Sequence, residues 1–306
     1  MKVLLTGATG FIGSQVARAL LAQGHEVRAS ARAGRAKDAV ADVADRIEWV
    51  TLDLFEASDA AIDALAHGTD ACVHLAWFAV PGQYLASPEN LRCVTGSLRL
   101  LESLAKQGCR RAVFVGSCFE YDFDGGRLSE TSPVRPQSLY AASKLSTRYM
   151  GEQLARQHGL EFVWARLFYL FGPFEDARRL VPSVIGALLR HESVDVTHGA
   201  QVRDFLHVAD VGSALATLAG SSLSGVVNVG SGQPVTVRQV VATLDALLGG
   251  DGLVRFGARP DNPTDPPFVL ADNRKLVQGT GWAPVHDLEG GLRQTIEWSK
   301  AHRAPR

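Results

Sequence analysis

Three glycines spaced three residues apart near the start of the chain constrain its fold more than any other feature. Gly7 and Gly10 follow the strand-like Lys2–Thr6, and Gly13 lies in the first turn of a helix-like segment, 11–23. Glycine lets the backbone approach a pyrophosphate closely, while the N–H groups and positive end of the following helix face the anion. With 30 glycines in 306 residues, this spacing is expected about 0.3 times by chance, so the pattern alone is weak evidence. Its place directly after a strand and at the start of a helix is what makes it strong evidence for a dinucleotide site. The alternative is a turn that serves helix packing alone.

The first half of the chain alternates short β-branched or apolar segments with longer segments of helical period. Expected strands are residues 2–6, 25–31, 47–52, 71–75, 112–117 and 162–168. Long amphipathic helices are expected at 88–107 and 138–158. This order predicts an α/β fold, a doubly wound parallel sheet of the Rossmann type with helices on both faces.

The rhythm changes after Gly172-Pro173 to shorter elements and a loop, 259–267, with four prolines in nine residues. We therefore expect a dinucleotide-binding Rossmann domain at 1–172 and a smaller C-terminal substrate domain at 173–306. The two domains are expected to be partly interleaved, because 207–218 reads as a helix and 225–229 as a buried strand. The chain would thus return to the first domain at 207–230, and 301–306 reads as a solvated tail.

The charge balance excludes several classes of partner. With 31 Lys+Arg against 32 Asp+Glu the net charge is −1, so no global positive field attracts a nucleic acid or an anionic membrane. The apolar stretch 71–80 is interrupted by His74 and is far shorter than the ~20 residues of a membrane span. The first residues lack a secretory signal pattern, so a cytoplasmic location is expected. The cysteines lack metal-site spacing and are expected to be packed thiols, and no metal is expected; they are Cys72, Cys93, Cys109 and Cys118.

The residues expected to cradle the dinucleotide are Gly7, Thr9, Gly10, Phe11, Ile12 and Gly13. Such folds usually place an acid about twenty residues on, where it binds the adenosine ribose. That acid is missing here: the window contains Arg32, with Arg35 nearby. A guanidinium pairs with a 2′-phosphate, which a carboxylate would repel. The sequence therefore favours NADP (NADPH), with NAD as the alternative; the competing interpretation of Arg32 is a solvated surface arginine.

Tyr140 and Lys144 are four residues apart on an expected helix and so share a face. A fixed cation about 5 Å from a phenol should lower the phenol's pKa by roughly two units, toward the range of a proton-transfer group. Ser117 ends a central parallel strand, where ligands bind in such sheets, and could hydrogen-bond a substrate oxygen. The alternative for Tyr140 and Lys144 is a pair on the helix surface without a catalytic role. The alternative for Ser117 is a cap at the end of the strand.

Together these features resemble the extended short-chain dehydrogenase/reductase family, in its sugar-nucleotide epimerase/dehydratase branch, over nearly the whole chain. The matching positions are Tyr140-Ala141-Ala142-Ser143-Lys144, Asp53-Leu54, His74-Leu75-Ala76, Arg166, Gly172-Pro173, Arg203-Asp204-Phe205, His207-Val208, Asp210-Val211 and Arg259-Pro260. The resemblance implies that Ser117, Tyr140 and Lys144 are catalytic. It also implies that cofactor contacts come from Asp53, Leu54, Leu75, Ala76, Tyr140 and Lys144.

The residues after Ser117 restrict the reaction. The resembling dehydratases carry an Asp-Glu pair there, whereas this chain has Cys118 and Phe119, so dehydration is not expected. We interpret Cys118 as a packed residue, with Glu120 left as a stray acid. Keto-reduction and epimerisation remain, and the missing acid near Arg32 favours the first. The expected activity is NADPH-dependent reduction of a nucleotide-linked 4-keto sugar, in a 6-deoxy form, with Tyr140 donating the proton.

The expected substrate contacts are Ser117, Tyr169, Arg203 and Arg259. The arginines would bind the nucleotide diphosphate or its ribose, although a lone arginine is more often solvated or ion-paired. Relatives commonly read Arg-x-x-Asn-x-Tyr-Gly-Pro, where this chain has Tyr169 and Phe171, so the pocket is altered. Relatives also often show Gly-Asp after the pair at 259–260, where this chain has Asp-Asn.

Two rival functions remain open. An epimerase would retain its NAD(P), and a non-catalytic NADP-binding regulator would lack turnover, although the intact catalytic trio argues against the regulator. His207 is interpreted as structural, because the trio already accounts for proton transfer. The resemblance further implies a homodimer formed through helices 88–107 and 138–158.

Overall fold

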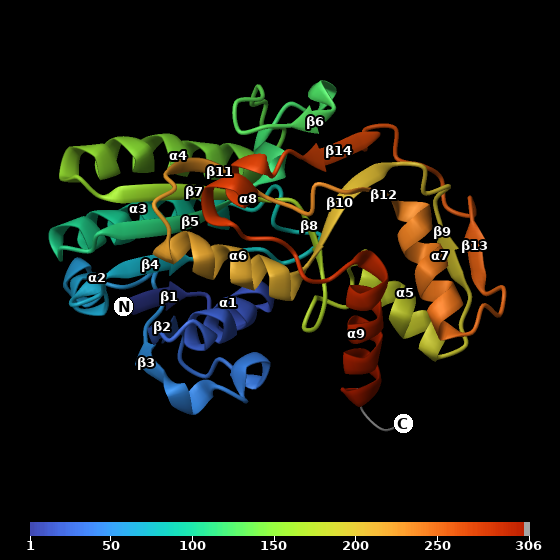
Figure 1. The fold of residues 1–306 in the computed structure, drawn as a ribbon, viewed down its shortest axis with the longest axis horizontal. Helices are drawn as coiled ribbons and strands as arrows, with labels where there is room; N and C mark the ends of the chain where they lie inside the picture. Colours follow the sequence, from blue (N-terminus) through green and yellow to red (C-terminus); the bar gives the residue numbers. More distant parts are fainter. Residues whose placement is uncertain (303–306) are drawn as a thin grey trace.

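A computed structural model describes residues 1–302, and a seven-stranded, entirely parallel sheet forms its larger part (Figure 1). The spatial order is β11-β7-β5-β4-β1-β2-β3, which reverses direction between β1 and β4. Its strands are β1 (Lys2–Thr6), β2 (Glu26–Ala31), β3 (Ile47–Thr51), β4 (Ala71–His74), β5 (Arg111–Ser117), β7 (Glu161–Leu167) and β11 (Gly225–Val229). In such sheets ligands bind beyond the carboxyl ends of the strands where the order reverses.

Helices cover both faces of this sheet (Figure 1). One face carries α1 (Phe11–Ala22) and α6 (Val208–Gly220); the other carries α2 (Asp59–Ala66), α3 (Glu89–Lys106) and α4 (Leu139–His158). Successive side chains of β1 point to opposite faces of the sheet, so they pack against different helix layers. Val3 and Leu5 join the core beneath α1 and α6, while Leu4 joins the core beneath α2, α3 and α4. The predicted doubly wound α/β fold is confirmed.

The chain crosses back to the large sheet late in the sequence. After β10 (Val202–His207), α6 packs against α1 and β11 pairs with β7 at the sheet edge. The helix and the strand expected at 207–218 and 225–229 are therefore both present, beside elements from the first half of the chain.

The remaining elements form smaller sheets and a second core. The short strands are β6 (Arg127–Leu128), β8 (Tyr169–Phe171), β9 (Val194–Val196), β12 (Pro234–Thr236), β13 (Val254–Phe256) and β14 (Phe268–Ala271). The helices here are α5 (Leu180–Leu189), α7 (Val237–Leu248), α8 (Arg274–Thr280) and α9 (Leu288–Ala301). Val184, Val241 and Ile296 bring α5, α7 and α9 together in one apolar cluster. Of the tail expected at 301–306, Ala301 closes α9, and 303–306 lie outside the described residues.

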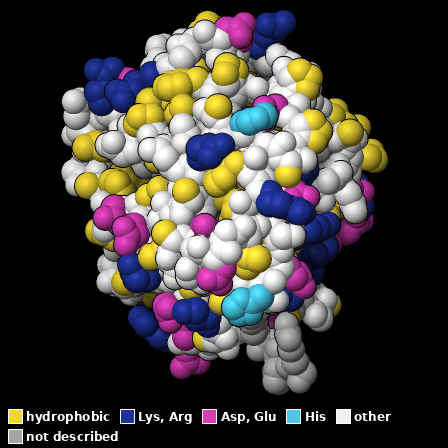
Figure 2. Space-filling view, turned by 90° about the vertical axis from the view of Figure 1, so that its right-hand side faces the viewer, with side chains coloured by type: hydrophobic (Ala, Val, Ile, Leu, Met, Phe, Trp, Pro, Cys, Tyr) yellow, Lys and Arg dark blue, Asp and Glu magenta, His cyan; other side chains and the backbone are white. Residues whose placement is uncertain are grey.

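Short 3-10 turns complete the chain: η1 (Asp38–Val40), η2 (Ala44–Arg46), η3 (Cys118–Glu120) and η4 (Phe123–Gly125). None of the helices formed by residues 1–302 combines the length and apolar character needed to cross a membrane. On the face over α5, α7 and β13, acidic and basic side chains are interspersed (Figure 2). All four cysteines are buried free thiols, which confirms their interpretation as packed residues.

Candidate active site

The glycine turn between β1 and α1 is built for close backbone approach. Gly7 has φ +75°, a conformation that side chains disfavour, and its carbonyl accepts from the N–H of Gly10 at 3.0 Å. A Cβ on Gly13 would lie 2.0 Å from the Gly7 oxygen, so no larger residue fits. Helix α1 begins without a side-chain cap and without an acid in its first turn. This uncapped positive end fits a dinucleotide pyrophosphate.

Thr6 joins the ends of β1 and β4 beside this turn. Its Oγ1 lies 2.7 Å from Nδ1 of His74 and accepts from the N–H groups of Leu75 and Ala76, both at 3.2 Å. Burial lowers the pKa of His74 to about 3, so the imidazole is neutral and acts as a hydrogen-bonding spacer. A Cβ on Gly7 would lie 3.0 Å from the Ala76 nitrogen. The expected cofactor contacts Leu75 and Ala76 thus lie directly against the glycine turn.

The residues expected at the adenosine end lie after β2 and β3. Arg32 directly follows β2 and its side chain is exposed. The carboxylate of Asp53 accepts from the N–H of Phe55 at 3.1 Å and shapes the turn after β3, while Leu54 is buried. Arg32 is therefore placed where its guanidinium can reach a ligand beyond the strand ends.

Ser117 ends β5, and its hydroxyl caps η3 by accepting from the N–H of Phe119 at 3.2 Å. Tyr140 is the second residue of α4, which is capped by the hydroxyl of Ser138. The Ser117 side chain lies close enough to the Tyr140 phenol to oppose the rise in its pKa. The strand-end cap considered for Ser117 is thus present, together with the expected contact to Tyr140.

Burial governs the protonation of both titratable members of the trio. It raises the pKa of Tyr140 above its ordinary value, with Tyr84 as a second cause and the nearby Ser117 side chain opposing. The predicted lowering of this pKa by Lys144 was wrong. The Lys144 ammonium lies 5.9 Å from the Tyr140 ring centre, and burial lowers the pKa of Lys144 itself to about 7.

Glu120, expected as a stray acid, is instead a buried structural carboxylate. It accepts from the backbone N–H of Ser117 at 2.8 Å, from Nε1 of Trp164 at 3.0 Å and from Nε of Arg166 at 2.8 Å. Both Glu120 and Arg166 are fully buried. A Ser-x-x-Glu capping box was the sequence signal for this role. Glu120 therefore fixes the backbone of Ser117.

Cys118 and Phe119 occupy the positions of the dehydratase acid–base pair. Burial raises the pKa of the Cys118 thiol to about 12, so the thiol stays protonated at neutral pH. Phe119 packs edge-on against Tyr169, with ring centres 6.3 Å apart. These two positions provide no acid–base pair for elimination of water.

The expected substrate residues are only partly brought together. Arg203 is buried, pairs with Asp265 at 2.6 Å and lies with its guanidinium 5.2 Å from the Tyr169 ring centre. Arg259 follows β13, is exposed, and donates its backbone N–H to the carbonyl of Val196. Tyr169 and Arg203 are therefore neighbours, whereas Arg259 belongs to the β9–β13 ribbon.

Three ligand-type side chains meet away from the trio, where α6 begins. Atoms of His207, Asp210 and His286 lie within 4.8 Å of one another. The Asp210 carboxylate already accepts from the N–H groups of Val285 and His286, and lies 3.1 Å from Nδ1 of His286. Asp210 thus connects the segment before α9 to α6. The His207 ring accepts from the N–H of Ala209 at the start of the same helix, which agrees with its interpretation as a structural residue.

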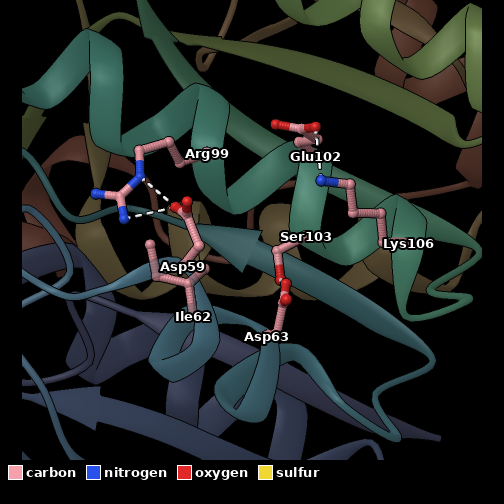
Figure 3. Close-up of a pocket in the computed structure, with 7 residues that line it drawn as sticks. All are labelled: Asp59, Ile62, Asp63, Arg99, Glu102, Ser103 and Lys106. Atoms are coloured by element: carbon pink, nitrogen blue, oxygen red, sulfur yellow. Dashed lines mark hydrogen bonds and ion pairs between the residues drawn. The ribbon is translucent and has the colours of Figure 1, made fainter.

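One polar surface pocket lies between α2 and α3 (Figure 3). Asp59 pairs with Arg99 and Asp63 with Ser103 across it, while Glu102 and Lys106 pair along α3 at its rim. Its volume of about 50 Å³ holds a few waters and is far too small for a nucleotide. None of the residues expected at the active site lines this pocket.

Comparison with known proteins agrees with this geometry. The model of the NAD dependent epimerase/dehydratase family matches residues 3–230. UDP-glucuronic acid decarboxylase 1 of Xenopus tropicalis is 29% identical over 97% of this chain and 72% of its own length. The UDP-N-acetylglucosamine 4-epimerase of Methanobrevibacter ruminantium M1, solved with UDP-N-acetylmuramic acid, is 27% identical and superposes with a TM-score of 0.90 over 99% of both chains.

A Streptomyces venezuelae dTDP-glucose 4,6-dehydratase, solved with NAD, is 27% identical with a TM-score of 0.86, covering 99% of this chain and 98% of that one. The match to the family model extends over three quarters of the sequence. It includes the glycine turn, the parallel sheet and the residues Ser117, Tyr140 and Lys144. The chain is an enzyme of the NAD dependent epimerase/dehydratase family.

Proposed function

We propose that the protein transfers hydride between a nicotinamide dinucleotide and C4 of a nucleotide-linked hexose. The observation that carries this proposal is the meeting of Ser117 and Tyr140 at the carboxyl end of β5, with Lys144 one helical turn further along α4. NAD(P), when bound, supplies or accepts the hydride. The glycine turn would hold its pyrophosphate, and Asp53, Leu54, Leu75 and Ala76 would flank its remaining parts.

Each member of the trio has a distinct task. Tyr140 donates a proton to the C4 oxygen as the ketone is reduced, and its burial keeps the phenol in the protonated form that donation requires. Ser117 hydrogen-bonds the same oxygen. Lys144 supplies positive charge beneath both groups and binds the nicotinamide ribose. Tyr169, Arg203 and Arg259, in the region 173–306 or close to it, would contact the sugar and its diphosphate.

The form of the reaction that we favour is NADPH-dependent reduction of a 4-keto, 6-deoxy sugar nucleotide. Arg32 supports this form because it stands, exposed, where NAD-binding relatives of the fold carry a ribose-binding acid. The protonated Cys118 and the apolar Phe119 argue against dehydration.

Epimerisation at C4 with retained NAD is the second candidate. It uses the same trio in both directions, and the structural relative with the TM-score of 0.90 is a 4-epimerase. The dehydratase relative was solved with NAD rather than NADP.

A substrate panel separates these functions. Purified protein would be mixed with UDP- and dTDP-linked hexoses and 4-keto-6-deoxyhexoses, each with NADH, with NADPH and without added cofactor. A reductase consumes NADPH with the keto sugars, whereas an epimerase interconverts hexoses without net change in reduced cofactor. Binding of NADPH without turnover of any sugar would identify a regulator and contradict the proposal.

A further inference from the structure

Lys144 lies against an indole ring rather than a carboxylate. Its side chain is 4% exposed, and its ammonium donates to the carbonyl of Val115 at 2.8 Å. The same ammonium lies 3.7 Å from the centre of the Trp77 ring. A desolvated ammonium over an indole face is stabilised by the negative ring surface.

The titratable groups around Lys144 offer it little other support. His74 on β4 is neutral, because burial lowers its pKa to about 3. Burial raises the pKa of Cys93 on α3 and of Tyr140 on α4, which keeps both groups uncharged at neutral pH. Glu120 of η3 acts on Lys144, but its carboxylate is paired with Arg166. The Val115 carbonyl and the Trp77 ring are therefore the close electrostatic contacts of the ammonium, and the ring is the one that a side-chain substitution can remove.

Hydrogen bonds hold the indole in this position. Its Nε1 donates to Oδ1 of Asn90 at 2.8 Å, and the fully buried Asn90 donates in turn to the carbonyls of Tyr84 and Ser87. The next N–H, of Phe78, donates to the Cys93 sulfur at 3.3 Å. Trp77 is thus fixed to α3 from both its ring and its backbone.

We propose that Trp77 is a positioning residue of this enzyme, whose indole face keeps the Lys144 ammonium charged and directed toward Tyr140. The ring also meets Tyr140 edge-on, with centres 6.4 Å apart, so it orders both functional side chains. The role in catalysis rests on the proposed function, whereas the effect on the charge of Lys144 does not.

The direct test measures the pKa of Lys144 by NMR of the lysine side chains in the substrate-free protein. The chain has six lysines, and a Lys144→Met variant assigns the signal. Trp77→Leu should lower this pKa by about one unit, the size expected for a desolvated cation–π contact, and Trp77→Phe by less. Trp49→Leu is the matched control, because it removes an indole of β3 whose ring centre lies 4.2 Å from the ammonium of Lys37.

A second measurement changes the charge distribution of the Trp77 ring while its shape stays nearly the same. Fluorinated tryptophan, incorporated at all five tryptophans, weakens the negative ring face and should also lower the Lys144 pKa. The same labelling of the Trp77→Phe protein should have no effect. A pKa that is unchanged in both Trp77→Leu and the fluorinated protein overturns the proposal, as does an equal decrease in the leucine and phenylalanine variants. If the panel finds no turnover but the pKa shifts, the proposed function fails and this inference stands.

Discussion

At the scale of a single residue, the proposed preference for NADPH rests on Arg32. If its guanidinium pairs with a 2′-phosphate, Arg32→Ala should weaken NADPH binding about 10- to 100-fold and NADH binding much less. Calorimetric titration with each cofactor measures both affinities. Arg46→Ala is a suitable control, because this arginine lies at the opposite end of the β2–β3 pair and donates to the carbonyl of Leu21. Equal losses for the two cofactors would remove the argument for NADP.

Spacing, together with the family resemblance, predicted the candidate catalytic residues before the fold was known. Tyr140 and Lys144 followed from an i, i+4 pair, and Ser117 from the end of a parallel strand. Their pKa values could not be predicted, because burial depends on neighbours distant in sequence. Trp77 and Tyr84 were missed for a related reason: they lie between β4 and α3, in a segment without periodicity, and reach the site only through the fold.

Helices α3 and α4 together present exposed apolar side chains to solvent. Leu91 on α3 and Tyr149 and Met150 on α4 are exposed, at 58%, 48% and 53%. An apolar surface of this kind on two packed helices is typical of an interface, and we propose that a second copy of the chain covers it.

Sedimentation at micromolar concentration should therefore give twice the chain mass of 32.8 kDa. The double variant Leu91→Arg, Met150→Arg should sediment as a folded monomer, because the interface would bury unpaired charge. Val285→Arg provides the control, since Val285 is 83% exposed and lies away from both helices. A monomeric parent protein would contradict the dimer.

Long periodic elements were predictable and short ones were not. The strands of the large sheet and helices α1, α3 and α4 were expected within one or two residues of their observed bounds. The strands β6, β8, β12 and β14 have only two to four residues, too few to show a period of two. Their pairing is set by contacts between distant segments, such as β10 with β14.

The stability of the whole molecule should depend on pH through its buried histidines. Burial lowers the pKa of His74 to about 3 and that of His207 to about 4, against 6.5 in the unfolded chain. The unfolded state then binds more protons below pH 6.5, so stability falls as pH decreases from 6.5 toward 4. Glu175, whose pKa burial raises to about 8, acts in the opposite direction between 4.5 and 8.

His74 and His207 together outweigh Glu175 in this interval, so the free energy of unfolding should decrease as the pH falls from 6 to 5. Urea unfolding at several pH values measures this slope. A free energy of unfolding that is constant, or that increases, over this interval would show that the histidines are not held neutral in the folded protein.

The most direct test of the account compares turnover and cofactor binding in Tyr140→Phe. Loss of the phenol hydroxyl should reduce turnover of the active sugar nucleotide about 10²- to 10⁴-fold while leaving cofactor affinity within about twofold of the parent. Tyr149→Phe removes a hydroxyl from a ring on the same helix that is 48% exposed, and should remain close to the parent in both measurements. A Tyr140→Phe protein that binds cofactor and turns over substrate as fast as the parent would contradict the assignment of Tyr140 as proton donor.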